Sequence, residues 1–123
     1  METTAFDLAA ADAELNEMVL TGRALEGFDK YYAADVVMQE ATGQTFEGKE
    51  LNRKREIEFF DSIAEWHSGA CTAAAVNGDV SLSEWAMDVT FKNGFRYKLE
   101  QAAVRRWKNG KIVHERFYYN AAK

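Results

Sequence analysis

Apolar residues recur at helical spacing in two short stretches near the start of the chain. The first stretch is centred on Leu15 and the second on Phe28, and Gly22 lies between them. A glycine between two periodic stretches is typical of a break between helices. We therefore predict two helices, over residues 8–21 and 24–32.

A β-rich run and a longer helical pattern follow. Residues 36–40 read Val-Val-Met-Gln-Glu, and the next residues, around Gly43, have the composition of a turn. A third helix is expected over residues 48–66. Its apolar face consists of Leu51, Phe59, Phe60, Ile63 and Trp66. The first half of the chain therefore predicts three helices and one short strand.

Asn-Gly pairs divide the second half of the chain at residues 77–78, 93–94 and 109–110. Asn-Gly is the strongest short hairpin signal, because both residues of a two-residue type I′ turn need a positive φ. The pairs delimit four expected strands, over residues 70–76, 79–92, 95–108 and 111–119. Strands as long as the middle two twist strongly, so we predict a curved antiparallel sheet with a concave side.

The turns also set an expected register, in which Lys92 pairs with Phe95 and Lys108 with Lys111. Alternation then gives the concave face these side chains: Trp85, Met87, Val89, Phe91, Ala102, Val104, Val113, Phe117 and Tyr119, with Glu100 and Glu115. The opposite face carries further large apolar residues, among them Tyr97, Leu99, Ile112 and Tyr118. Three helices can cover only one face, so we expect the second face to form a homodimer interface. A slip of one residue would exchange the two faces of a strand.

The composition indicates one domain over residues 1–123, with 47% apolar and 13% aromatic residues. The single cysteine, Cys71, excludes an internal disulfide. His67 and His114 lie too far apart in sequence for a local metal motif, so we expect no metal and no cofactor. The chain begins without a basic leader, and no apolar run approaches the roughly 18 residues of a membrane span. We expect a cytoplasmic protein with no membrane partner.

Charge is unevenly distributed around a net value of −5. Residues 1–50 hold 11 acids and 3 bases, whereas residues 92–116 hold 8 bases and 2 acids. The run Arg105-Arg106-Trp107-Lys108 has the composition of a strand that binds nucleic acid. However, alternation sends Arg105 and Arg106 to opposite faces, and the chain is acidic overall. We therefore expect the acidic and basic parts to meet each other or a protein partner, and no nucleic-acid partner.

Three stretches in this order are informative together: Tyr-Tyr-Ala-Ala-Asp-Val-Val-Met-Gln-Glu at 31–40, Phe-Glu-Gly-Lys-Glu-Leu at 46–51, and Trp-Lys-Asn-Gly-Lys-Ile-Val at 107–113. With the order of the elements, they resemble the nuclear transport factor 2-like superfamily, and within it the SnoaL-like branch. The resemblance covers nearly the whole chain. It implies an α+β cone, in which three helices from the N-terminal half pack on a strongly curved antiparallel sheet. Isomerases, cyclases, epoxide hydrolases and non-catalytic binding modules share this fold, so it implies no single function.

The resemblance carries over one catalytic group. Glu40 falls where ketosteroid isomerases have a proton-shuttling carboxylate, at the end of the first strand. The positions of their oxyanion hole hold Leu15 or Asn16, and Ala102 or Ala103. The positions of the Arg and two Asp of limonene-epoxide hydrolases hold Trp85, Met87 and Phe117. Phe117 also stands where SnoaL-like cyclases have an acid/base Asp.

The candidate catalytic residues are Glu40 as general base, with Glu100 and Tyr119 assisting it. Each has a plainer interpretation: Glu40 as a strand-end carboxylate in water, and Tyr119 as a core residue. The plainer interpretation of Glu100 is an ion pair with a basic residue at the surface of the sheet. The expected ligand pocket is lined by Trp85, Met87, Val89, Phe117, Met38, Phe59 and Ile63.

Two functions remain open. The first is an isomerase, cyclase or lyase that transfers a proton on a small, apolar, carbonyl-bearing substrate. The alternative is a non-catalytic module that binds a small apolar ligand or a protein. Burial of Glu40 and Glu100 beside an apolar cavity favours the enzyme, and exposure favours the module.

Overall fold

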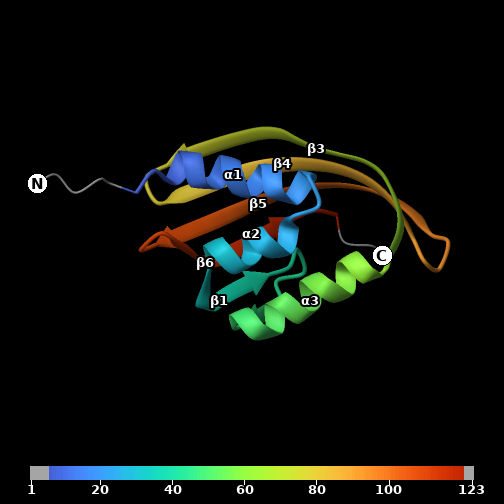
Figure 1. Cartoon of the computed structure of the whole chain (residues 1–123), viewed down its shortest axis with the longest axis horizontal. Coiled ribbons are helices and arrows are strands. Elements are labelled where there is room, and N and C mark those ends of the chain that lie inside the picture. Colours follow the sequence, from blue (N-terminus) through green and yellow to red (C-terminus); the bar gives the residue numbers. More distant parts are fainter. Residues whose placement is uncertain (1–5, 121–123) are drawn as a thin grey trace, which may run out of the picture.

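Three helices lie on one side of a curved, six-stranded sheet in residues 6–120, the range described by this computed structural model (Figure 1). The helices are α1 (Leu8–Leu20), α2 (Ala24–Tyr31) and α3 (Lys49–Asp61). The strands are β1 (Tyr32–Gln39), β2 (Thr45–Glu47), β3 (Ile63–Asn77), β4 (Val80–Phe91), β5 (Arg96–Lys108) and β6 (Lys111–Tyr118). The predicted α+β class, with helices from the N-terminal half on a curved sheet, is confirmed.

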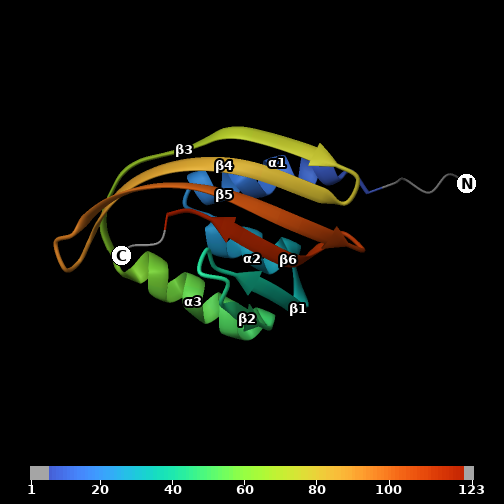
Figure 2. The same ribbon diagram turned by 180° about the vertical axis from the view of Figure 1, so that it is seen from behind.

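The strand order in the sheet is β2-β1-β6-β5-β4-β3. Strands β3 to β6 form the predicted antiparallel meander, and β1 joins it by pairing in parallel with β6. Figure 2 shows the sheet from its outer side, with α1 and α2 behind the strands and α3 below the long strands. The inner side of the sheet therefore faces α1, α2 and α3.

The apolar core lies between α1, α2 and the strands β1, β5 and β6. Its buried members are Ala11, Leu15, Met18, Phe28, Tyr31, Tyr32, Val36, Met38, Trp107 and Ile112. Aromatic rings hold α2 in place, because Phe28 stacks on Tyr32 and Tyr31 packs edge-on against Trp107. Within residues 6–120, no helix is both long and apolar enough to cross a membrane.

Helix α3 ends at Asp61, five residues before its expected end. The apolar spacing that predicted a continuous helix runs on through Ile63 and Trp66, but both residues belong to β3. Ile63 pairs with Phe91 of β4, and the backbone N–H of Lys92 donates to the Ser62 carbonyl at 2.8 Å. Pairing with the long strand β4 therefore overrides the local helical pattern.

The three Asn-Gly pairs form three different turns. Only Asn109 and Gly110 both have positive φ, at 53° and 77°, and Lys108 pairs with Lys111 as predicted. The first hairpin turns at Gly78 and Asp79, because Asn77 still pairs with Val80. The prediction of an Asn-Gly two-residue turn is right for the last hairpin and wrong for the first.

The β4–β5 hairpin has a three-residue loop, in which only Gly94 has a positive φ, of 90°. Phe91 donates its backbone N–H to Phe95 across this loop at 2.9 Å. Thr90 consequently pairs with Arg96, one residue away from the predicted register. A three-residue loop ending in a glycine is a common alternative to the type I′ turn.

This one-residue displacement exchanges the two faces of β5. Tyr97 and Leu99 lie on the inner face, and Ile112 is fully buried in the core. Of the four residues expected to form a dimer interface, only Tyr118 is exposed on the outer side, at 48%. The predicted composition of that interface is therefore wrong. Strand β5 starts one position later than expected, and a register shift between Arg106 and Trp107 changes the face on which Ile112 of β6 lies.

Candidate functional site

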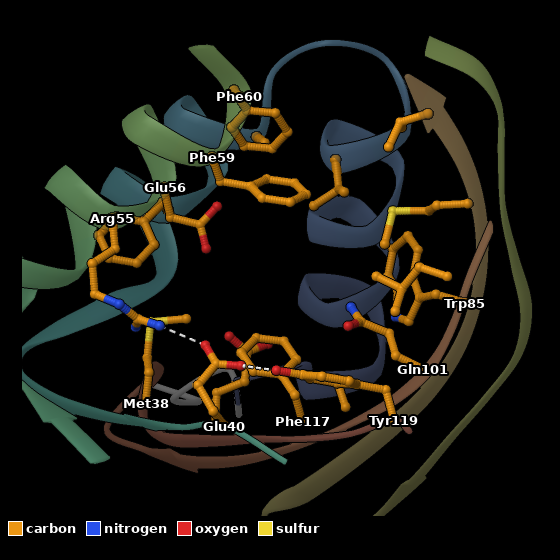
Figure 3. A pocket seen from close by; sticks show the side chains of 18 of the residues that line it. Met38, Glu40, Arg55, Glu56, Phe59, Phe60, Trp85, Gln101, Phe117 and Tyr119 are labelled. Atoms are coloured by element: carbon orange, nitrogen blue, oxygen red, sulfur yellow. Dashed lines mark hydrogen bonds and ion pairs between the residues drawn. The ribbon is translucent and has the colours of Figure 1, made fainter. Parts of the chain in front are cut away.

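A cavity of about 430 Å³ lies between the inner face of the sheet and the three helices. Aromatic side chains make up much of its wall: Phe28, Tyr32, Phe59, Phe60, Trp85, Phe91, Tyr97, Phe117 and Tyr119. The size and the apolar lining, with a few charged groups, are typical of small-molecule sites. Figure 3 shows ten labelled side chains around this space.

At the edge of the cavity, Glu40 makes two polar contacts. Its Oε1 accepts a hydrogen bond from Nη2 of Arg55 at 2.5 Å, and its Oε2 accepts one from the Tyr119 hydroxyl at 2.8 Å (Figure 3). Burial, and then the hydrogen bond to Glu40, raise the pKa of Tyr119 to about 12. Arg55 also donates to Asn52 and lies over the ring of Phe46. The Glu40 carboxylate is therefore held by α3 and by the chain after β6.

Glu56 lies on α3, one turn after the fully buried Asn52, and its carboxyl points into the cavity (Figure 3). Among the side chains drawn there, the Glu56 carboxyl has no hydrogen bond or ion pair, in contrast to Glu40. Burial, and next the negative charge of Glu115, raise the pKa of Glu56 from 4.5 to about 7. Glu56 is therefore close to half protonated at neutral pH.

Beneath the cavity, Arg105 of β5 connects the sheet to α1. Its Nε donates to Oε2 of Glu115 at 2.8 Å, and its Nη1 donates to Oδ1 of Asp12 at 2.8 Å and to Oδ1 of Asn16 at 2.6 Å. Burial opposes the charge on Arg105, but Glu115 and Asp12 hold its pKa above the usual range. The expected contact between the acidic and basic parts of the chain occurs here, in the interior.

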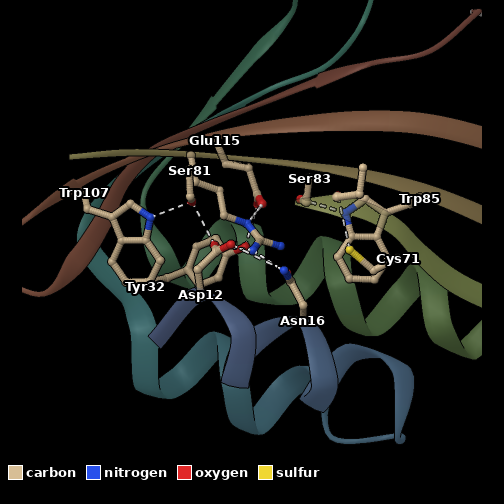
Figure 4. Close-up of polar contacts among 11 residues, drawn as sticks. Asp12, Asn16, Tyr32, Cys71, Ser81, Ser83, Trp85, Trp107 and Glu115 are labelled. Atoms are coloured by element: carbon tan, nitrogen blue, oxygen red, sulfur yellow. Dashed lines mark hydrogen bonds and ion pairs between the residues drawn. The ribbon is translucent and has the colours of Figure 1, made fainter. Parts of the chain in front are cut away.

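Further hydrogen bonds complete this buried network (Figure 4). The Tyr32 hydroxyl donates to Oε1 of Glu115 at 2.6 Å, and burial raises the pKa of Tyr32 well above its ordinary value. Ser81 donates to Oδ1 of Asp12 at 2.8 Å, and the indole N–H of Trp107 donates to Ser81 Oγ at 2.9 Å. Both carboxylates therefore have several donors, which a buried charge requires.

The described residues contain no group of three or more His, Cys, Asp or Glu side chains placed to hold a metal ion.

Comparison with known proteins identifies the family. The family described as "SnoaL-like domain" matches residues 9–119, almost the full length of the chain. The chain belongs to the SnoaL-like family. No curated protein matches it.

Solved structures agree with this SnoaL-like assignment. A Mesorhizobium loti protein named as a SnoaL-like polyketide cyclase is 30% identical over 93% of this chain and all of that chain, with a TM-score of 0.82. A Burkholderia pseudomallei nuclear transport factor 2-like protein of unknown function is 22% identical, covering 91% and 89% of the two chains, with a TM-score of 0.76. A Catenulispora acidiphila protein of ketosteroid isomerase-like fold, in complex with trimethylamine, is 19% identical over 89% and 85%, with a TM-score of 0.72.

Eight of the ten side chains singled out from the sequence line the cavity of this SnoaL-like domain: Met38, Glu40, Phe59, Trp85, Met87, Val89, Phe117 and Tyr119. The expected position of Glu100 is wrong, because the displaced register of β5 puts it on the outer face, where it is exposed. The expected position of Ile63 is also wrong, because that residue is the first of β3 and not part of α3.

Sequence reasoning missed three charged residues of the cavity wall, namely Arg55, Glu56 and Arg105. The expected apolar face of the third helix includes neither Arg55 nor Glu56, and Arg105 is absent from the side chains expected on the concave face of the sheet. One signal for Glu56 is present in the sequence. Asn52, Glu56 and Phe60 are four residues apart and therefore share one side of α3, on which Phe60 belongs to the expected apolar face.

Proposed function

We propose that this SnoaL-like protein is an isomerase, cyclase or lyase that transfers a proton on a small, apolar, carbonyl-bearing substrate. The observation that carries the proposal is Glu56, whose carboxyl faces an apolar cavity with a pKa of about 7. A general acid–base group works best when its pKa is close to the operating pH. At neutral pH, Glu56 is available both to accept and to return a proton.

The proposed step needs no co-reactant. Ionised Glu56 takes a proton from a carbon next to the substrate carbonyl, and the electron pair of that C–H bond forms a carbon–carbon double bond. The π electrons of the carbonyl move onto its oxygen, which becomes an enolate. In a substrate with a carbon–carbon double bond beside the deprotonated carbon, the enolate extends over that double bond. Protonated Glu56 then returns the proton to the far carbon of the double bond, and the carbonyl forms again. Atoms, electrons and charge balance over this cycle.

Glu40 and Tyr119 assist in this proposal by positioning. Both Glu40 oxygens already accept hydrogen bonds, from Arg55 and Tyr119, so they are less available to take a substrate proton than the carboxyl of Glu56. Glu40 instead fixes the Tyr119 ring and the Arg55 side chain at the cavity edge. The general base proposed here is therefore Glu56, one turn along α3 from Asn52.

The experiment incubates the protein with a panel of small cyclic ketones in D₂O and follows deuterium incorporation by mass spectrometry. Glu56→Gln keeps the shape of the side chain and removes the base, so the exchange rate should fall by about two to four orders of magnitude. Glu40→Gln should reduce the rate less. The matched control is Glu58→Gln on the exposed side of α3, which should leave the rate unchanged. Equal rates in the wild type and Glu56→Gln would overturn the proposal.

The second candidate is a non-catalytic module that binds a small ligand. It is favoured by the apolar side chains of Trp85, Met87 and Phe117 in the cavity wall, where related enzymes are expected to carry polar groups. The neighbour of this fold that is in complex with trimethylamine also supports this candidate. Ligand binding reported by tryptophan fluorescence and weakened in Phe117→Asp, with no deuterium exchange, would favour this module over the enzyme.

A further inference from the structure

Arg105 has an unused hydrogen-bond donor at the cavity. Its side chain is 4% exposed and contributes to the cavity wall. Nε and Nη1 are bonded to Glu115, Asp12 and Asn16, whereas Nη2 makes no hydrogen bond with any described residue. In residues 6–120, Nε of Arg116 is the one side-chain nitrogen that is both fully enclosed and without a partner. Since Nη2 of Arg105 also has no partner, it is not fully enclosed. Guanidinium N–H groups in a largely buried side chain are normally hydrogen-bonded, so Nη2 is placed to donate to an oxygen in the cavity.

Three other donors on the cavity wall are already committed. The hydroxyl of Tyr32 donates to Glu115, that of Tyr119 donates to Glu40, and the indole N–H of Trp85 donates to Ser83. Two competing donors remain: the amide of Gln101, which points into the cavity in Figure 3, and the hydroxyl of Tyr97 on the cavity wall. Both residues lie on the same face of β5 as Arg105, but no buried network fixes their polar groups as Asp12 and Glu115 fix the guanidinium.

We infer that Nη2 of Arg105 binds the carbonyl oxygen of the substrate, and that the site selects neutral carbonyl compounds over carboxylates. The inference rests on the proposed function, which defines the substrate as a small, apolar carbonyl compound. Its structural basis is the buried, immobilised guanidinium with one free edge. Such a donor is preorganised, so it costs little reorganisation when the oxygen gains charge.

The selection against anions follows from the charges around Arg105. Asp12 and Glu115 together carry two negative charges against the single positive charge of the guanidinium. Arg55 neutralises Glu40, and Glu56 adds a further negative charge whenever it is ionised. A carboxylate ligand would add one more negative charge to an apolar space that already holds an excess of them.

The proposed enolate escapes this penalty. When Glu56 takes the substrate proton, its own negative charge disappears as the charge on the oxygen develops. The total charge in the cavity therefore stays constant, and the N–H of Nη2 stabilises the oxygen that now carries it. In the same proton transfer, Glu56 is therefore the base and Arg105 binds the carbonyl oxygen.

The test uses three probes with the same ring system: 2-acetonaphthone, 2-naphthoate and 2-ethylnaphthalene. Calorimetry with the wild-type protein should give the ketone about tenfold or more tighter binding than either the carboxylate or the hydrocarbon. A crystal structure with the ketone should place its oxygen within hydrogen-bond distance of Nη2. Binding of 2-naphthoate as tight as that of the ketone, or a ketone oxygen on Gln101 or on the Tyr97 hydroxyl, would overturn the inference.

Variants add an independent measure. Arg105→Lys keeps the positive charge but loses the free edge, and should abolish the preference for the ketone over the hydrocarbon. Gln101→Leu, on the same face of β5, should keep that preference. If Arg105→Lys fails to fold, the three-probe comparison and the crystal structure still decide the matter on the wild type. If the ketone oxygen binds Nη2 but Glu56→Gln leaves deuterium exchange unchanged, the proposed function is wrong and the assignment of Arg105 stands. If Glu56→Gln slows exchange but the ketone oxygen does not bind Nη2, only the assignment of Arg105 is wrong.

Discussion

Two acidic side chains on the cavity wall, Glu40 and Glu56, differ in their partners. Glu40 has Arg55 and Tyr119, whereas Glu56 faces an apolar wall. The sequence could predict Glu40, because the family resemblance selects it. It could not predict which carboxyl is paired, since that depends on Arg55 of α3 reaching the end of β1. Partners distant in sequence, and not residue type, separate the two acids.

The raised pKa of Glu56 makes stability depend on pH. The folded pKa is about 7 and the ordinary value is 4.5, so between these values the folded state binds more protons than the unfolded state. The free energy of unfolding should therefore fall as pH rises from about 4.5 through 7, and this contribution should level off above that. Glu56→Gln lacks this contribution. As pH rises over this range, the free energy of unfolding of the variant should therefore increase relative to that of the wild type by about 2–4 kcal/mol.

Urea denaturation at pH 5 and at pH 8 measures this difference. Glu58→Gln, on the exposed side of the same helix, should show no pH-dependent gain. A constant offset between the wild type and Glu56→Gln at both pH values would contradict the shifted pKa.

At the level of elements, the sequence predicted α1, α2 and the last hairpin well, because each has a local signal. Asn109-Gly110 alone forms the two-residue turn that its sequence favours. The end of α3 was wrong because Ile63 pairs with Phe91, a contact between distant residues. The face of β5, and with it Glu100, was wrong because a three-residue loop and a two-residue loop both accommodate Asn93-Gly94. Local sequence does not decide between those loops, and one residue exchanges every side chain of the strand.

Gly48 sets the start of the helix that carries Arg55 and Glu56. Its backbone has φ 96° and ψ 144°, a region essentially restricted to glycine. Apart from the adjacent residues of the chain, nothing lies within 4 Å of the position that a Cβ would take, so the cost of a side chain is conformational and not steric. Gly48→Ala should therefore lower the free energy of unfolding by about 1–3 kcal/mol.

Chemical denaturation tests this prediction. Lys54→Ala at an exposed position of α3 is the control, and its stability should change by less than about 0.5 kcal/mol. Gly48→Asn should not restore stability, because asparagine favours left-handed helical angles and not this region. Wild-type stability in Gly48→Ala would show that α3 can begin in another conformation.

For the whole molecule, the contact of Asp12 with Arg105 joins the acidic N-terminal part to the basic meander, and Arg105 contributes to the cavity wall. The outer side of the sheet has no such cover from the helices (Figure 2). Leu82 and Tyr118 are exposed there at 44% and 48%, and they pair with Val104 and Ala102 of β5. We propose that this outer face forms a homodimer, since a contiguous apolar patch favours association.

Light scattering at tens of micromolar protein should report a dimer, because an interface of standard size holds at about that concentration. The double variant Leu82→Glu and Tyr118→Glu should be monomeric. Leu51→Glu, at an exposed position of α3, is the matched control and should remain dimeric. A monomeric wild type would contradict the proposed dimer.

The most direct test of the central claim is the titration of Glu56 itself. Carbon-13 NMR of the side-chain carboxyl in the wild-type protein, assigned by the signal missing in Glu56→Gln, gives its midpoint between pH 4 and 9. A carboxyl that faces the apolar cavity near the negative charge of Glu115 should titrate with a pKa of about 7. A midpoint near the ordinary value of 4.5 would show that Glu56 is solvated, and would contradict its assignment as the acid–base group of the cavity.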